Sequence, residues 1–431
     1  MLNQIKTLGK SFWLFRIGQF ISGAGDSINT IAIAWWILEK TGSATVMSSI
    51  IAPLSFFNYA LLPILGPLGD RFSRKGIAII SDIWRGSLIV IISIMVFMDI
   101  FYLPLVIIIF ILYGIGSALF LSIENSIVPQ LVADKHLFHA MRHSQIITSL
   151  GAIIGSATGG LIVAFLGVGE AFILDASTFF IASLLAAFMK VKTTSSASKK
   201  PVLKSFKISS FAEEIIDGLR VLFKLPTLFG LSLVAMFINF SISPLVIVLP
   251  VLIKSDLNHD SWVYGLTQAG QGIGAILGGL FIGYLCRKIK ADGVLILGTL
   301  LISSSFILFS LISNSYILPF LLLIFGIGCS ITNIPIKTQM ALSIPDHYRS
   351  RIFSSLQFFT RGIKPIGIAL AGLIIESYNT KVTLQMMGTG VLLLVPGLLL
   401  IPHIKTFLRA DPKETSVFFE KYYPGVIKKK Q

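Results

Sequence analysis

The sequence predicts an all-α integral membrane protein with twelve transmembrane helices. Of its 431 residues, 54% are hydrophobic and only 13% are charged, whereas soluble domains carry about 25% charged residues. A spanning helix needs about 20 apolar residues, and cutting the chain at its clusters of charged and turn-forming residues leaves twelve stretches of that kind. Because these runs are long and do not alternate with polar residues, they indicate helices and not a barrel.

The predicted spans divide into six and six around a long polar interruption. They are 13–38, 44–68, 76–98, 103–128, 139–166, 171–190, 226–253, 261–286, 292–313, 316–343, 352–376 and 382–407. We therefore predict an N-terminal six-helix bundle at 1–190, a cytoplasmic linker with an amphipathic helix at 191–225, a C-terminal six-helix bundle at 226–407 and a basic, solvated cytoplasmic tail at 408–431.

A weak internal repeat relates the two halves. At a shift of 212 residues, Gly66 falls on Gly278 and Gly155 falls on Gly367. Two six-helix repeats with a substrate site between them, near the middle of the membrane, are typical of one large class of transporters. The repeat therefore predicts two pseudo-symmetric bundles.

The loop charges predict the orientation. Only Lys40, Lys254 and Lys381 fall in loops on one side, and nearly all other Lys and Arg residues outside the helices fall on the opposite side. By the positive-inside rule, that side and both termini are cytoplasmic. Lys6, Lys10 and Arg16 precede a first apolar run that is too long for a signal-peptide core, so we expect a retained helix.

The sequence predicts no cofactor, metal or nucleic-acid site. The net charge of +15 comes from residues between apolar runs and not from a basic face with interleaved aromatics. Cys286 and Cys329 cannot build a disulfide framework or a zinc site. His136, His139 and His143 have helical spacing but no adjacent carboxylate or cysteine pair, and no phosphate-binding loop motif occurs.

The loop between the second and third predicted helices carries the most specific motif. It reads Gly66-Pro-Leu-Gly-Asp70-Arg71-Phe-Ser-Arg74-Lys75. Small residues allow close helix approach, an acid favours a helix N-terminus, and the basic residues anchor the cytoplasmic face. The loop resembles the signature of the major facilitator superfamily, G-x-x-x-D-R-x-x-R-K, at every defined position. An ordinary positive-inside loop would not need the glycine or the aspartate there.

Over nearly its whole length the chain also resembles the branch of that superfamily that holds macrolide efflux proteins and the enterobactin exporter. The similar segments include 41–43, 128–132, 174–176 and 344–346. The resemblance implies a twelve-helix secondary transporter that alternates between inward- and outward-facing states. It also implies export of amphipathic compounds driven by the proton gradient, and we expect a functional monomer.

The fifth predicted helix contains a glycine motif, Gly151, Gly155, Gly159 and Gly160. Small residues four apart form a groove for tight packing against another helix. The spacing is also similar to the superfamily's antiporter motif, which is associated with export, although Ser156 stands where that motif has proline. The missing proline removes a helix-distorting element.

Charged residues in the hydrocarbon region cost about 2.5 to 3.5 kcal/mol each by insertion scales and are functional candidates. Asp26, in the middle of the first helix, could bind and release a coupling proton, with Glu124 as the second candidate. Asp26 and Asn29 are also assigned to substrate binding. The alternative for Asp26 is a hydrogen-bonded polar residue at a helix interface, and both readings stay open.

Arg361 and Lys364 lie near the middle of the predicted span 352–376 and one turn apart, which would place them on one face. They predict a cationic wall that attracts an acidic substrate group. The alternative is structural pairing with a buried carboxylate such as Asp26 or Glu124.

A second charged group lies near the cytoplasmic end of the third helix. Asp82 and Arg85 are three residues apart and are predicted to join Asp70 and Arg71 in a network that holds the inward gate. Asp175, close to the outer end of the sixth helix, is predicted to be a helix cap or part of a gate.

Taken together, the sequence predicts a proton antiporter that exports small amphipathic molecules from the cell membrane, and not an enzyme. Two alternatives stay open. One is an importer or lysolipid flippase, and the other is a membrane receptor or assembly partner that transports nothing.

Overall fold

The structure is a computed structural model and describes residues 8–65, 72–132, 137–190, 220–312, 314–344, 346–415, 417–424 and 426. All regular elements within these residues are helices, and no strand occurs among them. Helices are expected in lipid because each satisfies its backbone N–H and C=O groups internally. The chain divides into two compact units, Met1–Phe206 with Ile253–Ala269, and Lys207–Leu252 with Gly270–Gln431.

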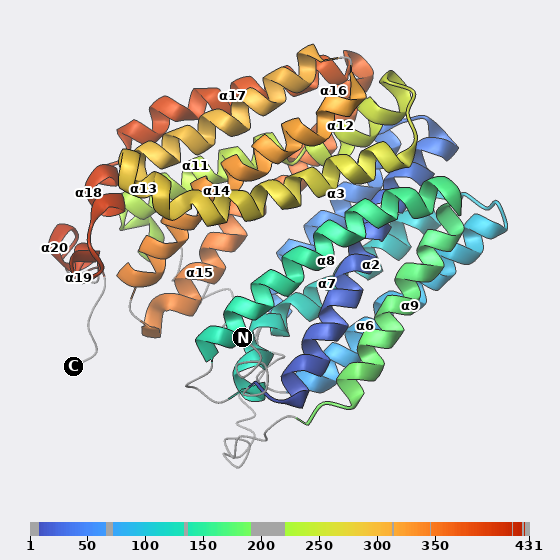
Figure 1. The fold of residues 1–431 in the computed structure, drawn as a ribbon, viewed down its shortest axis with the longest axis horizontal. Helices are drawn as coiled ribbons and strands as arrows, with labels where there is room; N and C mark the ends of the chain where they lie inside the picture. Colours follow the sequence, from blue (N-terminus) through green and yellow to red (C-terminus); the bar gives the residue numbers. More distant parts are fainter. Residues whose placement is uncertain are drawn as a thin grey trace. The chain divides into compact units, whose positions relative to one another are not determined.

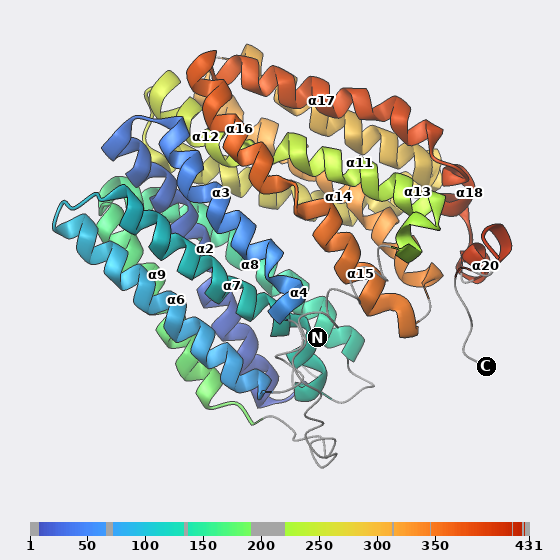
Figure 2. The same cartoon turned by 180° about the vertical axis from the view of Figure 1, so that it is seen from behind.

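Seven helices form the main part of the first unit. They are α2 (Lys10–Thr41), α3 (Ala44–Ala60), α4 (Leu62–Leu65), α6 (Arg74–Phe97), α7 (Leu103–Leu131), α8 (Leu137–Phe165) and α9 (Val168–Ala187). Within this unit α2 packs against α8 and α9, α6 packs against α7 and α9, and α3 packs against α7 (Figures 1 and 2). This packing surrounds the cavity described below.

Local chemistry explains where these helices begin and end. Gly42 ends α2 in the left-handed conformation, with φ 61°, and donates its N–H to the Leu38 carbonyl at 2.9 Å. The Ser43 hydroxyl then accepts from the Val46 N–H at 3.1 Å and starts α3. Ser73 starts α6 in the same way.

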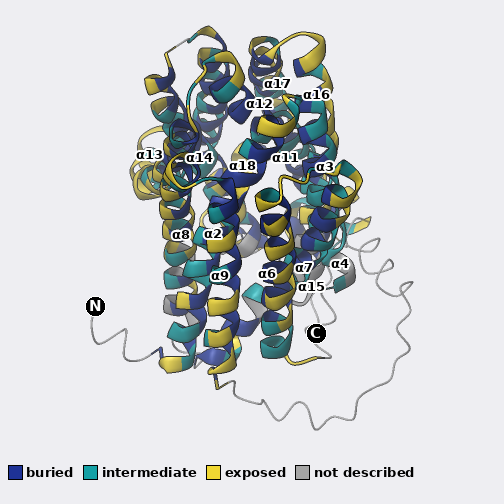
Figure 3. Ribbon diagram, turned by 90° about the vertical axis from the view of Figure 1, so that its right-hand side faces the viewer, coloured by how far each residue is buried: buried dark blue, intermediate teal, exposed yellow. Residues whose placement is uncertain are grey.

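Helix α6 carries charged side chains on its buried face and apolar side chains on its exposed face. Its exposed residues include Ile80, Ile83 and Ile94, whereas Asp82 and Arg85 are buried. Figure 3 shows exposed and buried residues along α6. A helix in a soluble protein has the opposite polarity. The exposed apolar face of α6 is therefore suited to contact lipid, in keeping with the predicted membrane span at 76–98.

The remaining helices follow from residue 226. They are α11 (Pro226–Ile242), α12 (Leu245–Val251), η3 (Leu252–Asp256), α13 (Ser261–Leu311), η4 (Ser315–Ile317), α14 (Leu318–Ser343), α15 (Asp346–Arg361), α16 (Lys364–Ser377), α17 (Thr380–Leu400), α18 (Ile404–Arg409), α19 (Pro412–Thr415) and α20 (Phe418–Tyr422). In this second unit α11 packs against α15, α16 and α17.

Nine helical segments among the described residues are long and apolar enough to cross a membrane. One of them, α13, has 51 residues and leaves helical geometry at Lys290, with φ 60° and ψ 163°. At 1.5 Å per residue it would be about 77 Å long, more than twice the hydrocarbon thickness, so it covers two predicted spans. The other two predicted spans fall on α2, which carries several charges, and on α3, which has only 17 residues.

Two predicted spans are interrupted by proline. Span 226–253 breaks at Pro244, between α11 and α12, and span 352–376 breaks just before Pro365, between α15 and α16. Proline removes an N–H donor and clashes with the preceding turn, so a helix ends or restarts there. The predicted linker helix lies mostly outside the described residues.

The C-terminal segment is not simply a solvated tail, contrary to the prediction. Phe418 and Phe419 are 2% exposed and pack with Phe407 against α11 and α14 residues. Arg409 donates from Nε and Nη2 to the two carboxylate oxygens of Asp292 at 2.6 and 2.7 Å, and these hydrogen bonds raise the pKa of Arg409. The segment folds instead of staying in solvent because burial of Phe407, Phe418 and Phe419 stabilises it. The terminal lysines of the predicted basic tail lie outside the described residues.

Candidate functional site

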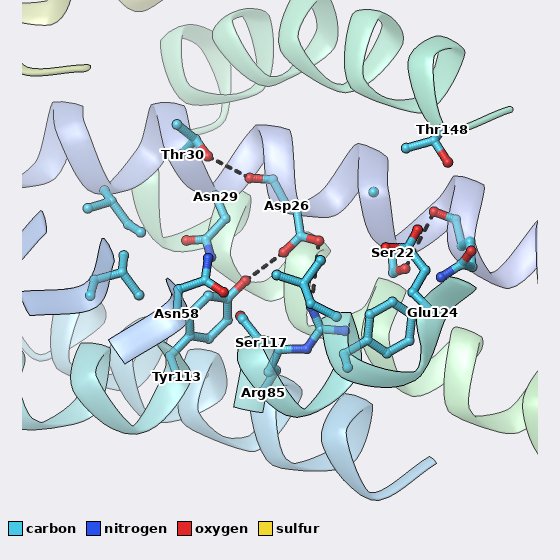
Figure 4. A pocket seen from close by; sticks show the side chains of 16 residues that line it. Ser22, Asp26, Asn29, Thr30, Asn58, Arg85, Tyr113, Ser117, Glu124 and Thr148 are labelled. Carbon is cyan, nitrogen blue, oxygen red and sulfur yellow. Dashed lines mark hydrogen bonds and ion pairs between the residues drawn. The ribbon is translucent and has the colours of Figure 1, made fainter. Parts of the chain in front are cut away.

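The first unit contains a polar cavity of about 390 Å³ (Figure 4). It opens among α2, α3, α6, α7 and α8. The residues that line it are Gln19, Ser22, Gly23, Asp26, Asn29, Thr30, Ile33, Leu54, Asn58, Arg85, Tyr113, Ser117, Phe120, Leu121, Glu124 and Thr148. Four predicted functional residues, Asp26, Asn29, Arg85 and Glu124, are therefore brought together.

Asp26 lies at the boundary between the open cavity and the buried interior. Its side chain is 42% exposed, whereas that of Arg85 is 4% exposed. The Tyr113 hydroxyl donates to Asp26 Oδ1 at 2.6 Å, and Arg85 Nη1 lies 3.7 Å from Oδ2. The carboxylate thus faces the open cavity on one side and a hydroxyl and a cation on the other.

Arg85 is the buried cation of this network. Its Nη2 donates to Asp82 Oδ1 at 2.6 Å, and its guanidinium carbon lies 4.8 and 4.3 Å from the ring centroids of Phe120 and Phe179. Such stacking attracts a cation to the aromatic ring face. The structure therefore places Arg85 in the cavity beside Asp26, and not only with Asp82 as the sequence predicted.

A second arginine lies towards the Glu124 end of the cavity. Arg16 is 2% exposed, donates to the Gln19 side chain and stacks at 5.0 Å from the Phe15 ring centroid. It also lies within electrostatic range of Glu124. Arg16, which directly precedes the first apolar run in the sequence, is thus buried inside the helix bundle, where Glu124 offsets part of its charge.

The glycines of α8 pack against α2. A Cβ atom at Gly155 would lie 2.6 Å from the Ala24 Cα, and a Cβ atom at Gly151 would lie 3.0 Å from the Phe20 carbonyl oxygen. Gly159 lies similarly close to α2. Gly160 instead contacts Gly265 at the start of α13, where the Ser261 hydroxyl donates to the Gly160 carbonyl at 2.9 Å. The motif thus holds α8 against two other helices.

The signature loop is only partly described. Gly66, Asp70 and Arg71 lie outside the described residues, and Arg74 begins α6. Lys75 donates from Nζ to the carbonyls of Ala187 and Met189 at 2.6 and 2.8 Å. These carbonyls lie at the C-terminal end of α9, where a cation is favoured.

In the second unit, Arg361 is the last residue of α15 and Lys364 is the first residue of α16. The prediction that both share one face of a continuous helix is therefore wrong, because the helix is interrupted between them. The charge of Arg361 acts on both Lys364 and Lys337 of α14. The three cations form one electrostatic cluster within this unit.

Several residues of the cavity, Tyr113 and Asn58 among them, were not singled out from the sequence. Tyr113 lies in an apolar run on α7, where a tyrosine resembles any other large core residue. Its neighbour Leu112 accepts a hydrogen bond from the Trp84 indole nitrogen at 2.9 Å, which ties α7 to α6 beside Arg85. Asn58 on α3 also lines the cavity.

Comparison with known proteins places these features in a family. The model of the Major Facilitator Superfamily matches residues 16–366 and 231–420. Macrolide efflux protein A of Streptococcus pyogenes is 25% identical over 419 residues, covering 93% of this chain and 98% of that protein. The multidrug efflux pump Tap of Mycolicibacterium fortuitum is 22% identical over 89% of this chain and 94% of its own length. The crystal structure of the nucleoside transporter NupG has a TM-score of 0.70 at 12% identity, covering 93% of this chain and 99% of that one, and shares the fold.

Proposed function

Because the chain belongs to the Major Facilitator Superfamily, we propose that this membrane transporter exports amphipathic small molecules by proton antiport with alternating access. The observation that carries the proposal is the half-exposed Asp26 carboxylate in a polar cavity, in front of the buried Arg85. The similarity to a macrolide efflux protein and a multidrug efflux pump supports the direction and the substrate class.

Asp26 is proposed to carry the coupling proton. Ionised, it accepts from Tyr113 and faces Arg85; protonated, it no longer offers Arg85 a negative charge. A change of one charge beside a buried cation alters the electrostatic energy of the whole network, because the interior screens charges weakly. Protonation is therefore able to bias the bundle between two conformations. Glu124, which lines the same cavity, is the second candidate.

The cavity lining supports an amphipathic substrate. Asn29, Asn58 and Ser117 offer hydrogen bonds, while Leu54 and Phe120 offer apolar contact. The volume of about 390 Å³ falls within the usual range for small-molecule pockets, about 300 to 1,000 Å³. Asp26 and Asn29 are assigned to substrate binding here.

In the second unit we assign the attraction of an acidic substrate group to Arg361 and Lys364. We assign the cytoplasmic gate to the signature loop with Asp82, and Arg85 links that gate to the cavity. The proposal also includes cytoplasmic termini, a monomeric working unit and the division into two bundles with a linker and a tail.

The experiment is proton flux in proteoliposomes with an imposed pH gradient. Macrolides, catechol siderophores and lysolipids are added in turn to the native chain, Asp26→Asn and the control Asp99→Asn. Asp99 is an exposed carboxylate paired with Lys40, and its φ of 57° suits asparagine. We expect substrate-triggered proton release in the native chain and in Asp99→Asn, and none in Asp26→Asn.

Other outcomes would redirect the assignment. Release that persists in Asp26→Asn makes that residue structural and moves the coupling role to Glu124. Lysolipid movement between leaflets without proton release would favour a flippase. Binding without any flux would favour a receptor.

A further inference from the structure

A second carboxylate lies behind the cavity without a hydrogen-bond partner. Asp175 on α9 is 0% exposed, and neither of its carboxylate oxygens has a hydrogen-bond partner among the described residues. The outward face of α9 beside it carries Ile173 and Leu174, which are exposed where the helix meets lipid. Leaving an ionised carboxylate unpaired at such a place costs several kcal/mol, so the neutral, protonated form is favoured.

This carboxylate lies directly beside the helix turn that carries Asp26. A Cβ atom at Gly25 would lie 2.5 Å from Asp175 Oδ1 and would overlap the Thr178 hydroxyl oxygen. Only a glycine allows α2 to approach α9 this closely. Asp175 also lies within electrostatic range of Asp26, Arg85 and Tyr113.

The hydrogen of the Thr178 hydroxyl is not directed at the Asp175 carboxylate. The hydroxyl has one hydrogen, and it donates that hydrogen to the Asp175 backbone carbonyl at 2.6 Å. Its oxygen can still accept a hydrogen bond, but only a protonated carboxyl group could donate one.

Arg85 contacts α9 one helical turn after Asp175. Its guanidinium stacks at 4.3 Å on the ring of Phe179, which is four residues after Asp175 on the same face of α9. Arg85 Nε is buried and has no hydrogen-bond partner in the described part of the chain. Arg85 thus has an unused donor beside Phe179, and Asp175, one turn earlier on α9, has an unused acceptor.

The charges around Arg85 make three ionised carboxylates unfavourable. Asp82 forms its close ion pair, Asp26 faces it from α2, and Asp175 lies near it on α9. One cation cannot compensate three buried or half-buried anions in a medium that screens weakly. One of the three is expected to hold a proton, and Asp175 is the most buried and least hydrogen-bonded.

We propose that Asp175 is a second proton-binding site, protonated in this state, that exchanges its proton with Asp26 during the transport cycle. The proton leaves a carboxyl oxygen of Asp175 and binds a carboxylate oxygen of Asp26. The negative charge moves from Asp26 to Asp175, and Arg85 turns its unused donor towards it. This exchange rests on the proposed proton antiport, but the protonation of Asp175 in the resting protein does not.

The first test is infrared spectroscopy of the purified native chain at pH 7 in water and in deuterium oxide. A protonated carboxyl group gives a band that shifts on deuteration. We expect the band in the native chain and in Asp99→Asn, and we expect its loss in Asp175→Asn. Thr178→Val retains Asp175 and removes the oxygen that would accept its hydrogen bond, so it should shift the band. A band that survives in Asp175→Asn, or that does not move in Thr178→Val, would overturn the assignment.

The second test is substrate-triggered proton release, which separates the exchange from the proposed antiport. In Asp175→Asn we expect at least a tenfold loss of proton release, with the substrate Kd changed less than about threefold. Native proton release in that variant would overturn the exchange even if the infrared band is lost. If the native chain itself shows no release, the proposed antiport fails, while the infrared result still decides whether Asp175 binds a proton.

Discussion

Arg85 has several partners around the cavity. It binds Asp82 directly, faces Asp26 and lies between two aromatic rings, and it is 3% exposed. A buried cation of this kind stabilises the fold only while its anions are present, because removing one member leaves the other charge unpaired. Arg85 is therefore required for the stability of the fold. It also transmits the change of charge on protonation of Asp26 to the rest of the network.

A double-mutant cycle on Arg85 and Asp82 tests this dependence. We expect Arg85→Gln to lower the free energy of unfolding by about 3 to 5 kcal/mol, because it leaves Asp82 buried without its cation. Asp82→Asn combined with Arg85→Gln should recover part of that loss, since no buried charge remains unpaired. Thermal unfolding in detergent measures the three variants. Additive losses in the double variant would contradict a direct ion pair.

At the scale of helices, the close packing of α8 on α2 depends on Gly155. Gly155→Ala places a methyl group 2.6 Å from the Ala24 Cα, so the helices must separate. We expect a loss of about 1 to 3 kcal/mol, typical of overpacking. Gly283→Ala in α13 is the matched control: no atom lies within 4 Å of the added methyl, and alanine favours a helix by up to about 1 kcal/mol. Equal thermal stability of the two variants would show that the contact is not required.

The C-terminal segment offers a second comparison between neighbouring residues. Phe418 is 2% exposed in the aromatic cluster, and Val417 is 41% exposed. Phe418→Ala should cost about 3 to 5 kcal/mol because it opens a cavity, whereas Val417→Ala should change stability by less than about 0.5 kcal/mol. Thermal unfolding monitored by circular dichroism would distinguish them. A small effect of Phe418→Ala would mean that this segment is only loosely attached.

The spans and the cavity were predictable to different extents. Long apolar runs revealed the nine described segments that are long and apolar enough to cross a membrane, because a lipid-facing helix needs no fixed partner to be recognised. The importance of Asp26 was predictable because a charge within an apolar span is costly. The pairing of Asp26 with Arg85 was not predictable, since the two residues are 59 positions apart and only packing brings α2 and α6 together. The helix breaks at Pro244 and Pro365 were missed for a different reason: hydropathy continues across them.

At the scale of the whole molecule, the driving force limits what the transporter can achieve. One proton moving down 100 mV releases about 2.3 kcal/mol, and each pH unit adds about 1.36 kcal/mol. Since 1.4 kcal/mol corresponds to a factor of ten, one proton can sustain a substrate gradient of the order of a hundredfold.

Ionophores test this coupling directly. In proteoliposomes, collapse of the pH gradient should lower the steady-state substrate gradient about tenfold per pH unit removed, and collapse of both gradients should abolish it. The measurement is accumulated labelled substrate with each ionophore added separately. Accumulation that survives removal of both gradients would exclude a proton-driven mechanism.

The hydrogen bond from the Trp84 indole to the Leu112 carbonyl provides the chain with its own optical reporter. The donor adjoins Arg85 and the acceptor adjoins Tyr113, so the indole spans the two helices that contact Asp26. Indole emission depends on the polarity and hydrogen bonding around the ring. A chain that keeps Trp84 and has phenylalanine at its four other tryptophan positions would thus reveal movement of α6 against α7 by fluorescence alone, in real time and without any attached dye.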